Sequence, residues 1–263
     1  MKHSFYTNRI VQKTTWITGC ARSGTTILGK ILSTLKGVEY AFEPETFYSL
    51  LPLINKIEKK YWSNIYKNYL INDLFYNLCV GRKINLKKNE LNSIYNSLSK
   101  KQVKQKLCLK LRRKEFDHYL KKNKKALIIK VPSLARSFLK LQNYYPQNRF
   151  IITKRNTSAI ISSLSKKNWF KKNSVHYLCN NKYWIEPKLL KVWAHSNEQE
   201  KAKLYVNVIE KYLKKIKNKY VVNFEILLRD PNKIIKEVCN YLNLKRTRKT
   251  DEMIEQIDTT KII

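Results

Sequence analysis

The sequence predicts an α/β fold in three layers, a mostly parallel sheet flanked by helices, with a helical insertion. Short runs of β-branched and aromatic residues recur along the chain, as in buried strands. Several are followed by segments with apolar residues at helical spacing, and such alternation favours a parallel sheet. The 263 residues are 43% hydrophobic and contain no internal repeat and no linker rich in Gly, Pro or Ser. We therefore expect one domain, 1–263.

The first strand, turn and helix are expected in the stretch TTWITGCARSGTTILGKILSTL. Thr14–Thr18 has the composition of a buried strand, and a helix begins at Thr25. Gly19 and Gly24 allow the connecting turn to bend sharply. This layout directs free backbone N–H groups and the positive end of a helix at an anion. Hydroxyl donors are present at the same place, from Ser23, Thr25 and Thr26.

The spacing of Gly19 and Gly24 nearly fits the phosphate loop of nucleoside triphosphatases, G-x-x-x-x-G-K-[ST]. Thr25 stands at the lysine position, and the cation lies within the loop, at Arg22. No strand elsewhere ends in an obvious Mg²⁺-binding Asp. The loop therefore predicts an anionic ligand and argues against ATP hydrolysis.

The segment ARSGTT after a strand resembles the 5′-phosphosulfate loop of sulfotransferases, which move a sulfuryl group from PAPS (3′-phosphoadenosine 5′-phosphosulfate). The resemblance implies a fold like that of P-loop-containing nucleoside triphosphate hydrolases. It also implies that PAPS is bound by Arg22, Ser23, Gly24, Thr25 and Thr26.

A second strand is expected at Val38–Phe42, and Pro44 ends it. The segment YAFEPETF resembles the FEP element of carbohydrate sulfotransferases, and tyrosylprotein sulfotransferases have a basic Glu at similar spacing. Glu43 matches both, which implies that it is the base that takes the proton of an acceptor hydroxyl. Glu45 is the alternative.

Residues 46–125 show helical periodicity and few strand signals, which predicts a helical insertion on the α/β frame. Three helices are expected, over 47–57, 61–80 and 91–111. Loops and helices inserted above the carboxyl edge of a sheet commonly determine which substrate an enzyme binds. We therefore expect this insertion to recognise the acceptor.

A third strand is expected at Ala126–Lys130, followed by a helix over Ser133–Tyr145 with Ser133 as its N-cap. In sulfotransferases a lysine that ends such a strand lies near the sulfuryl oxygens, and Lys130 matches it. Cytosolic members carry a catalytic His two residues later. Pro132 stands there in this chain, so the resemblance favours Glu43 as the base.

A fourth strand is expected at Arg149–Thr153, and Asn156 or Thr157 caps a helix that ends near Leu164. This unit resembles the 3′-phosphate-binding element of sulfotransferases. In that element an arginine follows the strand, and a serine lies eight residues after the arginine. Arg155 and Ser163 keep that spacing, which implies that they hold the 3′-phosphate of PAPS.

The remaining chain predicts a loop of aromatic and polar residues over 168–187, a single long helix over 189–216, a last strand over 220–224 and a helix over 231–242. The loop is either a lid over the acceptor or a surface loop with aromatic residues in the core. Arg246 and Arg248 lie in a basic segment, 245–249, that either contacts the 3′-phosphate or is solvated.

The cysteines are odd in number and widely spaced, and no CxxC occurs: Cys20, Cys79, Cys108, Cys179 and Cys239. This pattern favours reduced thiols over a disulfide framework or a zinc site. The first residues contain no apolar run long enough for a signal peptide or a transmembrane segment. We therefore expect a cytoplasmic protein.

Taken with the resemblance, the sequence predicts a PAPS-dependent sulfotransferase that acts without a metal. Glu43 is the expected base, and Arg22 and Lys130 offset charge on the sulfuryl group and the leaving phosphate. A carbohydrate hydroxyl, as in a bacterial surface glycan or glycolipid precursor, is the first choice of acceptor. A peptide tyrosine or a small alcohol is the second. A P-loop kinase or NTPase and a basic nucleic-acid-binding module remain as alternatives of other classes.

Overall fold

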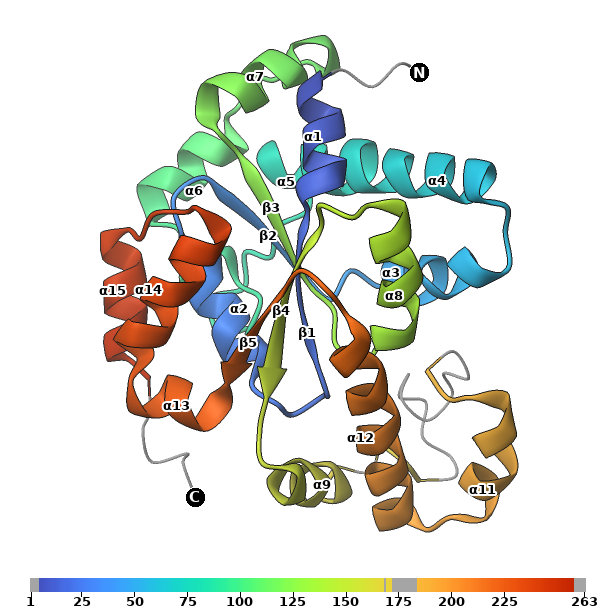
Figure 1. Ribbon diagram of the computed structural model, residues 1–263. Coiled ribbons are helices and arrows are strands. Elements are labelled where there is room, and N and C mark those ends of the chain that lie inside the picture. The colour runs from blue at the N-terminus through green and yellow to red at the C-terminus, as the bar shows by residue number, and fades with distance from the viewer. Residues whose placement is uncertain (1–4, 168, 172–183, 258–263) are drawn as a thin grey trace.

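The computed structural model describes residues 5–167, 169–171 and 184–257. Five strands form one sheet in the order β2-β3-β1-β4-β5, and all neighbouring strands are parallel (Figure 1). The strands are β1 (Thr15–Gly19), β2 (Val38–Phe42), β3 (Ala126–Lys130), β4 (Arg149–Lys154) and β5 (Lys219–Asn223). The parallel sheet is confirmed. Because β3 and β4 lie on opposite sides of β1, the loops that follow these three strands meet at one edge of the sheet.

Helices cover both faces of the sheet, which gives the expected three layers (Figure 1). One face packs against α2 (Thr25–Ser33), α14 (Pro231–Leu242) and α15 (Arg248–Glu255). The other face packs against α1 (Phe5–Lys13), α8 (Ala135–Tyr144), α12 (Glu198–Lys215) and part of the insertion.

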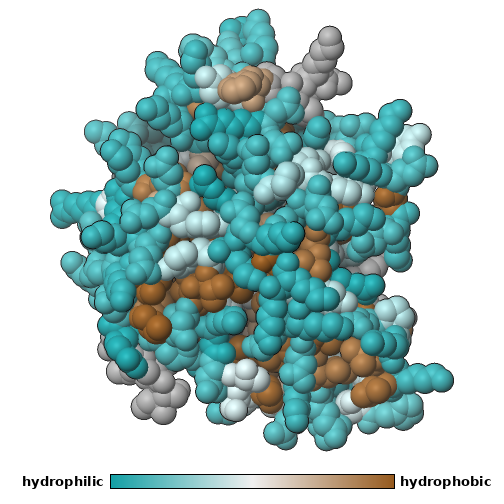
Figure 2. All heavy atoms as spheres, in the orientation of Figure 1, coloured by the Kyte–Doolittle hydropathy of each residue, from teal (hydrophilic) through white to brown (hydrophobic). Residues whose placement is uncertain are grey.

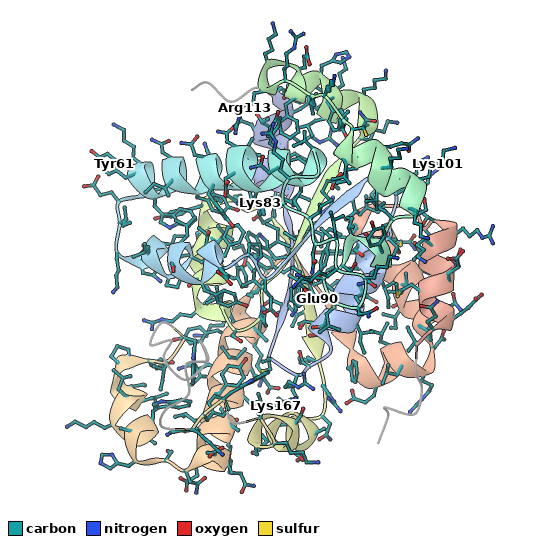
Figure 3. The ribbon with its side chains drawn as sticks, turned by 180° about the vertical axis from the view of Figure 1, so that it is seen from behind. Tyr61, Lys83, Glu90, Lys101, Arg113 and Lys167 are labelled. Atoms are coloured by element: carbon teal, nitrogen blue, oxygen red, sulfur yellow. The ribbon has the colours of Figure 1, made fainter. Side chains whose placement is uncertain are left out.

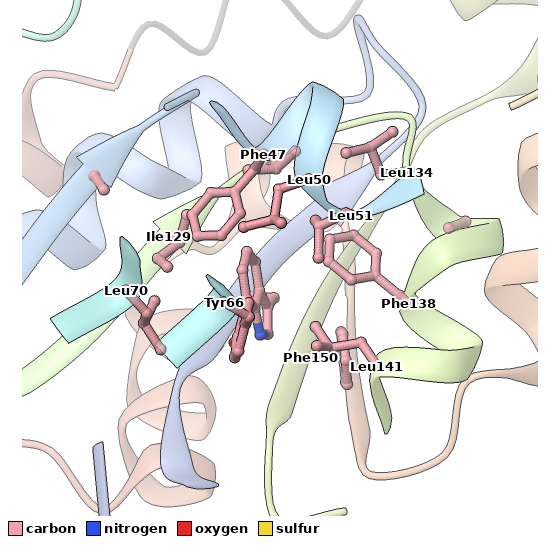
Figure 4. Packing of buried hydrophobic residues seen from close by; sticks show 14 of the residues in the cluster. Phe47, Leu50, Leu51, Tyr66, Leu70, Ile129, Leu134, Phe138, Leu141 and Phe150 are labelled. Atoms are coloured by element: carbon pink, nitrogen blue, oxygen red, sulfur yellow. The ribbon is translucent and has the colours of Figure 1, made fainter. Parts of the chain in front are cut away.

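Side chains of alternate residues on the buried strands pack into the two hydrophobic cores, one on each face of the sheet. On β1, Trp16 packs in the core beneath α8, and Ile17 packs in the core beneath α2. The Trp16 indole meets the ring of Phe47 edge to face, with centroids 5.1 Å apart. Figure 4 shows Phe47 among other buried rings, including Phe138 and Phe150. This aromatic core joins the insertion to the sheet, because Phe47 belongs to the insertion and Phe150 to β4.

The insertion is helical but more broken than its periodicity predicts. Its elements are α3 (Thr46–Leu50), η1 (Pro52–Asn55), α4 (Lys59–Lys67), η2 (Asn68–Phe75), α5 (Tyr76–Cys79), η3 (Ile94–Asn96), α6 (Lys100–Leu107), η4 (Arg113–Glu115) and α7 (Phe116–Asn123). The prediction over 61–80 is confirmed, with a π-helical middle, η2. The prediction of one helix over 91–111 is wrong. Ser99 and Gln102 form a capping box that starts α6 at Lys100.

The prediction of one helix over 189–216 is also wrong. The chain forms η5 (Pro187–Leu189) and α11 (Leu190–His195), then starts again as α12. Asn197 causes the break, since its side chain accepts from the N–H of Glu200 at 2.9 Å and Glu200 bonds back to the N–H of Asn197. The predicted loop over 168–187 lies largely outside the described residues.

The remaining helices are α9 (Thr157–Ser165) and α13 (Phe224–Arg229), which directly follow β4 and β5. The face in Figure 2 is mostly hydrophilic, with apolar residues in separate patches. Among the helices that the structure describes, none combines the length and the hydropathy that a membrane span requires.

Candidate functional site

The turn between β1 and α2 is held by small residues in close contact. A side chain on Gly19 would lie 2.6 Å from the hydroxyls of Ser23 and Thr153, so only glycine fits there. The Ser23 hydroxyl bonds to the Cys20 carbonyl at 2.7 Å and to the Thr153 hydroxyl at 2.6 Å. Ser23 is fully buried. Its hydroxyl therefore stabilises the turn, and its predicted contact with a ligand stays a prediction.

The turn leaves the N-terminus of α2 open to an anion. Gly24 is the N-cap, with φ of 95°, and supplies no side-chain hydrogen bond to the first helical turn. The N–H groups at that end have no intrahelical partners, so they are available to a ligand together with the positive end of the helix dipole. Thr25 and Thr26 are the first two residues of α2. Arg22, at φ of 70°, is exposed just before them.

The second strand–turn–helix unit, from β4 to α9, lies against this turn. The guanidinium of Arg155 donates to the carbonyl oxygen of Arg22 at 3.2 Å. Arg22 in turn donates through Nε to the hydroxyl of Ser163 on α9 at 2.9 Å. The structure thus brings together three residues that the sequence predicts for two phosphate groups. Asn156 caps α9, as predicted, by accepting from the N–H of Ala159 at 3.1 Å.

Phe224, at the start of α13, contacts both units. Its ring packs so closely on Gly24 that a methyl group there would lie 2.1 Å from a ring carbon. The guanidinium carbon of Arg155 lies 5.0 Å from the centre of the same ring. The neighbouring Glu225 accepts from the N–H of Asn156 at 2.9 Å. The sequence predicts Phe224 only as the last residue of a strand over 220–224, and no signal in the sequence marks it as a site residue.

Glu43 and Lys130 form an ion pair at the ends of the adjacent strands β2 and β3. The Glu43 N–H donates to the Lys130 carbonyl at 2.9 Å, and Glu43 adopts φ of 43°, in the left-handed region. The Lys130 side chain is 3% exposed and that of Glu43 is 26% exposed. The carboxylate is therefore open to a substrate on one side, whereas the ammonium is enclosed.

Burial lowers the pKa of Lys130 below its usual value. The carboxylate of Glu43 opposes this effect, and the positive charge of Arg22 adds to it. The ammonium also lies 4.4 Å from the centre of the Phe42 ring. Lys130 ends β3, the strand that pairs with β1, so the Glu43–Lys130 pair lies at the same edge of the sheet as the turn after β1.

Ser133 has a different role from the one predicted. The N-cap of α8 is Leu134, and Ser133 lies before it with φ of 72°. Its hydroxyl forms a 2.6 Å hydrogen bond with the hydroxyl of Tyr205, which also accepts from the N–H of Ala21 at 2.7 Å. Tyr205 on α12 thus links the turns after β1 and β3. Only the tertiary fold reveals this contact, since Tyr205 lies in a helix whose periodicity indicates nothing but packing.

The basic segment 245–249 lies at the other end of α2. Thr247 donates to the carbonyl of Thr34 at 2.8 Å, and Lys36 donates to the carbonyl of Lys245 at 2.9 Å. The nine residues of α2, about 13 Å of helix, separate this segment from the turn at Gly24. Of the two alternatives for this segment, the structure gives no support to contact with a 3′-phosphate.

Among the residues that the structure describes, no group of three or more His, Cys, Asp or Glu side chains is placed to hold a metal ion. The site is instead built from cations, hydroxyls and backbone N–H groups at the carboxyl edge of a parallel sheet. Such an arrangement suits an anionic ligand.

One comparison with known proteins identifies a family for this chain. A sequence model of the sulfotransferase family matches residues 15–248, which include all the residues of the site. A search of curated proteins found no match.

Among solved structures, the sulfotransferase domain of the Synechococcus PCC 7002 olefin synthase is similar at 16% identity, covering 94% of this chain and 80% of its own, with a TM-score of 0.48. A sulfotransferase domain from the curacin biosynthetic pathway is similar at 15% identity, with coverage of 94% and 79% and a TM-score of 0.47. A sulfotransferase from Mycobacterium tuberculosis is similar at 13% identity, with coverage of 96% and 73% and a TM-score of 0.45.

Proposed function

The chain belongs to the sulfotransferase family, and we propose that it moves a sulfuryl group from PAPS to a hydroxyl group of a carbohydrate. A bacterial surface glycan or glycolipid precursor is the proposed acceptor. The FEP segment around Glu43 and the absence of a His at position 132 favour this class over a peptide tyrosine or a small alcohol.

The single observation that carries the proposal is the hydrogen bond from Arg155 to the Arg22 carbonyl. It joins the turn after β1 to the turn after β4, so that the guanidinium of Arg155 lies against the turn that carries Arg22. PAPS carries a 5′-phosphosulfate and a 3′-phosphate on one ribose and needs two anion sites at short range. We assign the 5′ group to Arg22 and residues 23–26, and the 3′ group to Arg155 and Ser163.

In the proposed reaction, an acceptor hydroxyl attacks the sulfur of PAPS in line with the leaving phosphate oxygen. A new S–O bond forms to the acceptor as the S–O bond to the 5′-phosphate breaks, and PAP (3′-phosphoadenosine 5′-phosphate) leaves. Glu43 takes the proton of the hydroxyl. Lys130 and Arg22 offset the negative charge that develops on the sulfuryl and phosphate oxygens. The scheme uses no metal ion.

A cytoplasmic location is part of the proposal. The cysteines that the structure describes are all free thiols, Cys20, Cys79, Cys108 and Cys239, as in a reducing compartment. Burial raises the pKa of three of them, so these are not reactive thiolates: Cys20, Cys79 and Cys239.

Calorimetric titration with PAP, with ADP as the control, tests the proposed donor site. We expect PAP to bind at least about tenfold more tightly, because only PAP places a phosphate at Arg155 while it fills the first site. The difference should persist without Mg²⁺. Equal affinity for the two nucleotides, or no binding of PAP, would contradict the proposal. A kinase or NTPase would prefer ADP with Mg²⁺. A nucleic-acid-binding module would bind nucleic acid in an Arg22→Ala variant as well.

A further inference from the structure

A large groove runs along the outer edge of the sheet, separate from the two anion sites. All five residues of the edge strand β2 line it, and its other walls come from the C-terminal end of α2, segment 83–109 of the insertion and the start of α15. Its volume is about 1280 Å³. A pocket for a small, drug-sized molecule occupies roughly 300–1,000 Å³, so this β2 groove has room for a longer ligand. Figure 3 shows this side of the molecule, with Lys83 and Glu90 of the insertion labelled over the sheet.

One end of the β2 groove lies beside the proposed base. The lining continues from Phe42 to Pro44, Glu45 and Thr46, which flank Glu43 in the chain. At the other end lie Lys36 and Gly37, before the strand begins. Five strand residues at about 3.3 Å each separate these ends by roughly 16 Å. Glu43 does not itself line the groove, but a molecule that filled it would have one end against the chain neighbours of Glu43.

The backbone of β2 offers unpaired hydrogen-bonding groups to the groove. In the parallel register with β3, the odd-numbered residues of this segment make the interstrand bonds, as Gly37 and Glu43 do at its two ends. The N–H and C=O groups of Tyr40 and Phe42 therefore point away from β3. Among the described residues these four groups have no hydrogen-bond partner. The edge thus presents donors and acceptors in alternation.

The side chains around this edge are suited to sugars. Four aromatic rings line the groove, those of Tyr40, Phe42, Tyr69 and Tyr119. Amide side chains face them from the insertion, among them Asn92 and Gln105. A sugar ring has hydroxyls that both donate and accept and C–H faces that pack on aromatic rings.

Part of the charge in the β2 groove is paired, although the chain as a whole carries a formal net charge of +35. The buried carboxylate of Glu39 forms ion pairs with Lys106 and Lys125. The carboxylate of Glu252 pairs with two cations of its own helix, α15. These pairs neutralise part of the positive charge of the lining, and hydrogen bonding and ring packing add means of recognition that do not depend on charge.

We propose that the β2 groove binds the acceptor as an oligosaccharide of several sugar units, with the reacting hydroxyl at the Phe42–Thr46 end. The inference rests on the proposed sulfuryl transfer and gives the insertion a specific task, since segment 83–109 forms one wall. An extended peptide is the rival occupant, because it pairs with an open strand edge. The edge suits a peptide less well. The Val38 N–H already donates to the Leu35 carbonyl, so only Tyr40 and Phe42 offer both groups.

The experiment follows transfer from radiolabelled PAPS to a panel of chitin-, cellulose-, mannan- and galacturonan-derived saccharides, from monosaccharide to hexasaccharide, and to a set of tyrosine-containing peptides. For the accepted sugar, we expect kcat/KM to rise at least about tenfold from the disaccharide to the tetrasaccharide, because each added unit gains contacts in the groove. Activity that does not depend on length, transfer to peptides alone, or transfer to none of the panel would overturn the inference.

A pair of variants on α6 locates the binding. Gln105 is exposed, lines the groove and precedes Lys106, which pairs with Glu39 near the start of β2. Gln105→Trp should lower kcat/KM for the tetrasaccharide at least about tenfold, since the indole fills the groove far from Glu43. Lys104→Trp is the matched control, on the same helix and exposed but outside the groove. Equal effects of the two variants would also overturn the inference. PAP affinity should be unchanged in both, whereas failure of wild-type protein to bind PAP would instead refute the proposed donor site.

Discussion

Arg22 donates a hydrogen bond from Nε to the hydroxyl of Ser163 at 2.9 Å, across 141 residues of sequence. The sequence predicts Arg22 for the 5′ group of PAPS and Ser163 for the 3′-phosphate, and the contact shows that these assignments are coupled. Ser163 on α9 orients the guanidinium of Arg22, and the backbone carbonyl of Arg22 accepts a hydrogen bond from Arg155. The two anion sites therefore share a set of hydrogen bonds.

Ser163→Ala tests this coupling. Without the hydroxyl, the exposed guanidinium of Arg22 loses its orienting partner and the proposed 3′-phosphate site loses a donor. We expect PAP affinity to fall about ten- to a hundredfold, which corresponds to one lost hydrogen bond to a charged group. The nearby Ser162→Ala is the control, because Ser162 is exposed on the same helix. Calorimetry with PAP gives both values. Equal affinities of the two variants would show that the hydrogen bond does not contribute to binding.

Glu43→Gln should lower the rate of sulfuryl transfer by roughly a hundredfold or more, because an amide cannot accept the proton of the attacking hydroxyl. PAP affinity should change little, since Glu43 is not assigned to the nucleotide. Glu45→Gln is the matched control, two residues further on and more exposed. Single-turnover rates with PAPS separate the two carboxylates. If Glu45→Gln gives the larger loss, the base is Glu45.

Gly24→Ala should destabilise the protein by about 1–2 kcal/mol for the left-handed backbone and by a further 1–3 kcal/mol for the overlap with Phe224. Gly81→Ala is the control, because Gly81 also has positive φ, 73°, but its nearest neighbour would lie 3.3 Å from the new methyl group. Gly81→Ala should lower the free energy of unfolding only by the about 1–2 kcal/mol of the left-handed backbone. Urea unfolding measures both. A Gly24 variant no less stable than the Gly81 variant would show that the ring moves away easily.

Glu39→Ala should lower the free energy of unfolding by about 3–5 kcal/mol, because it leaves the ammonium groups of Lys106 and Lys125 without their buried partner. The side chain of Glu39 is 5% exposed and bridges β2 to α6 and to the residue before β3. The exposed Glu58 serves as the control, and Glu58→Ala should change stability by less than about 0.5 kcal/mol. Similar losses in both variants would mean that solvent replaces the buried pair.

Glu186→Gln should change the pH dependence of stability. Hydrogen bonds from Lys211 and Tyr212 lower the pKa of the Glu186 carboxyl from 4.5 to about 2. Because this pKa is lower in the folded state, its stabilising effect is present above pH 4.5 and is lost as the pH falls towards 2. The variant should be less stable by about 0.5–1 kcal/mol at pH 7, as for a pair near the surface, and the difference should vanish near pH 2. Thermal unfolding of the wild type and the variant, measured at several pH values from 7 to 3, should show the difference in stability becoming smaller as the pH falls. A constant difference would indicate a lost contact without linked protonation.

The positions of the candidate site residues could be predicted because these residues lie at fixed offsets from strands with clear patterns. The bounds of β2 and β3 are as predicted. Lys130 ends β3, and the other candidate residues follow the ends of three further strands at the same edge of the sheet: Arg22, Glu43 and Arg155. The wrong predictions concern polar residues whose side chains compete for hydrogen bonds with the backbone. Asn197 starts a new helix where apolar spacing predicts continuity, and Ser133 bonds to Tyr205 and not to its own helix.

The sequence by itself determined the α/β class, the strands and the kinds of side chain at their ends, because these depend on periodicity and residue type over short stretches. Only the tertiary structure decided which of those side chains meet. The contacts of Arg22 with Ser163, of Phe224 with Gly24 and of Tyr205 with two turns join segments that lie 72 or more residues apart in the sequence. The open edge of β2 is likewise a property of strand order, which no single stretch of sequence records.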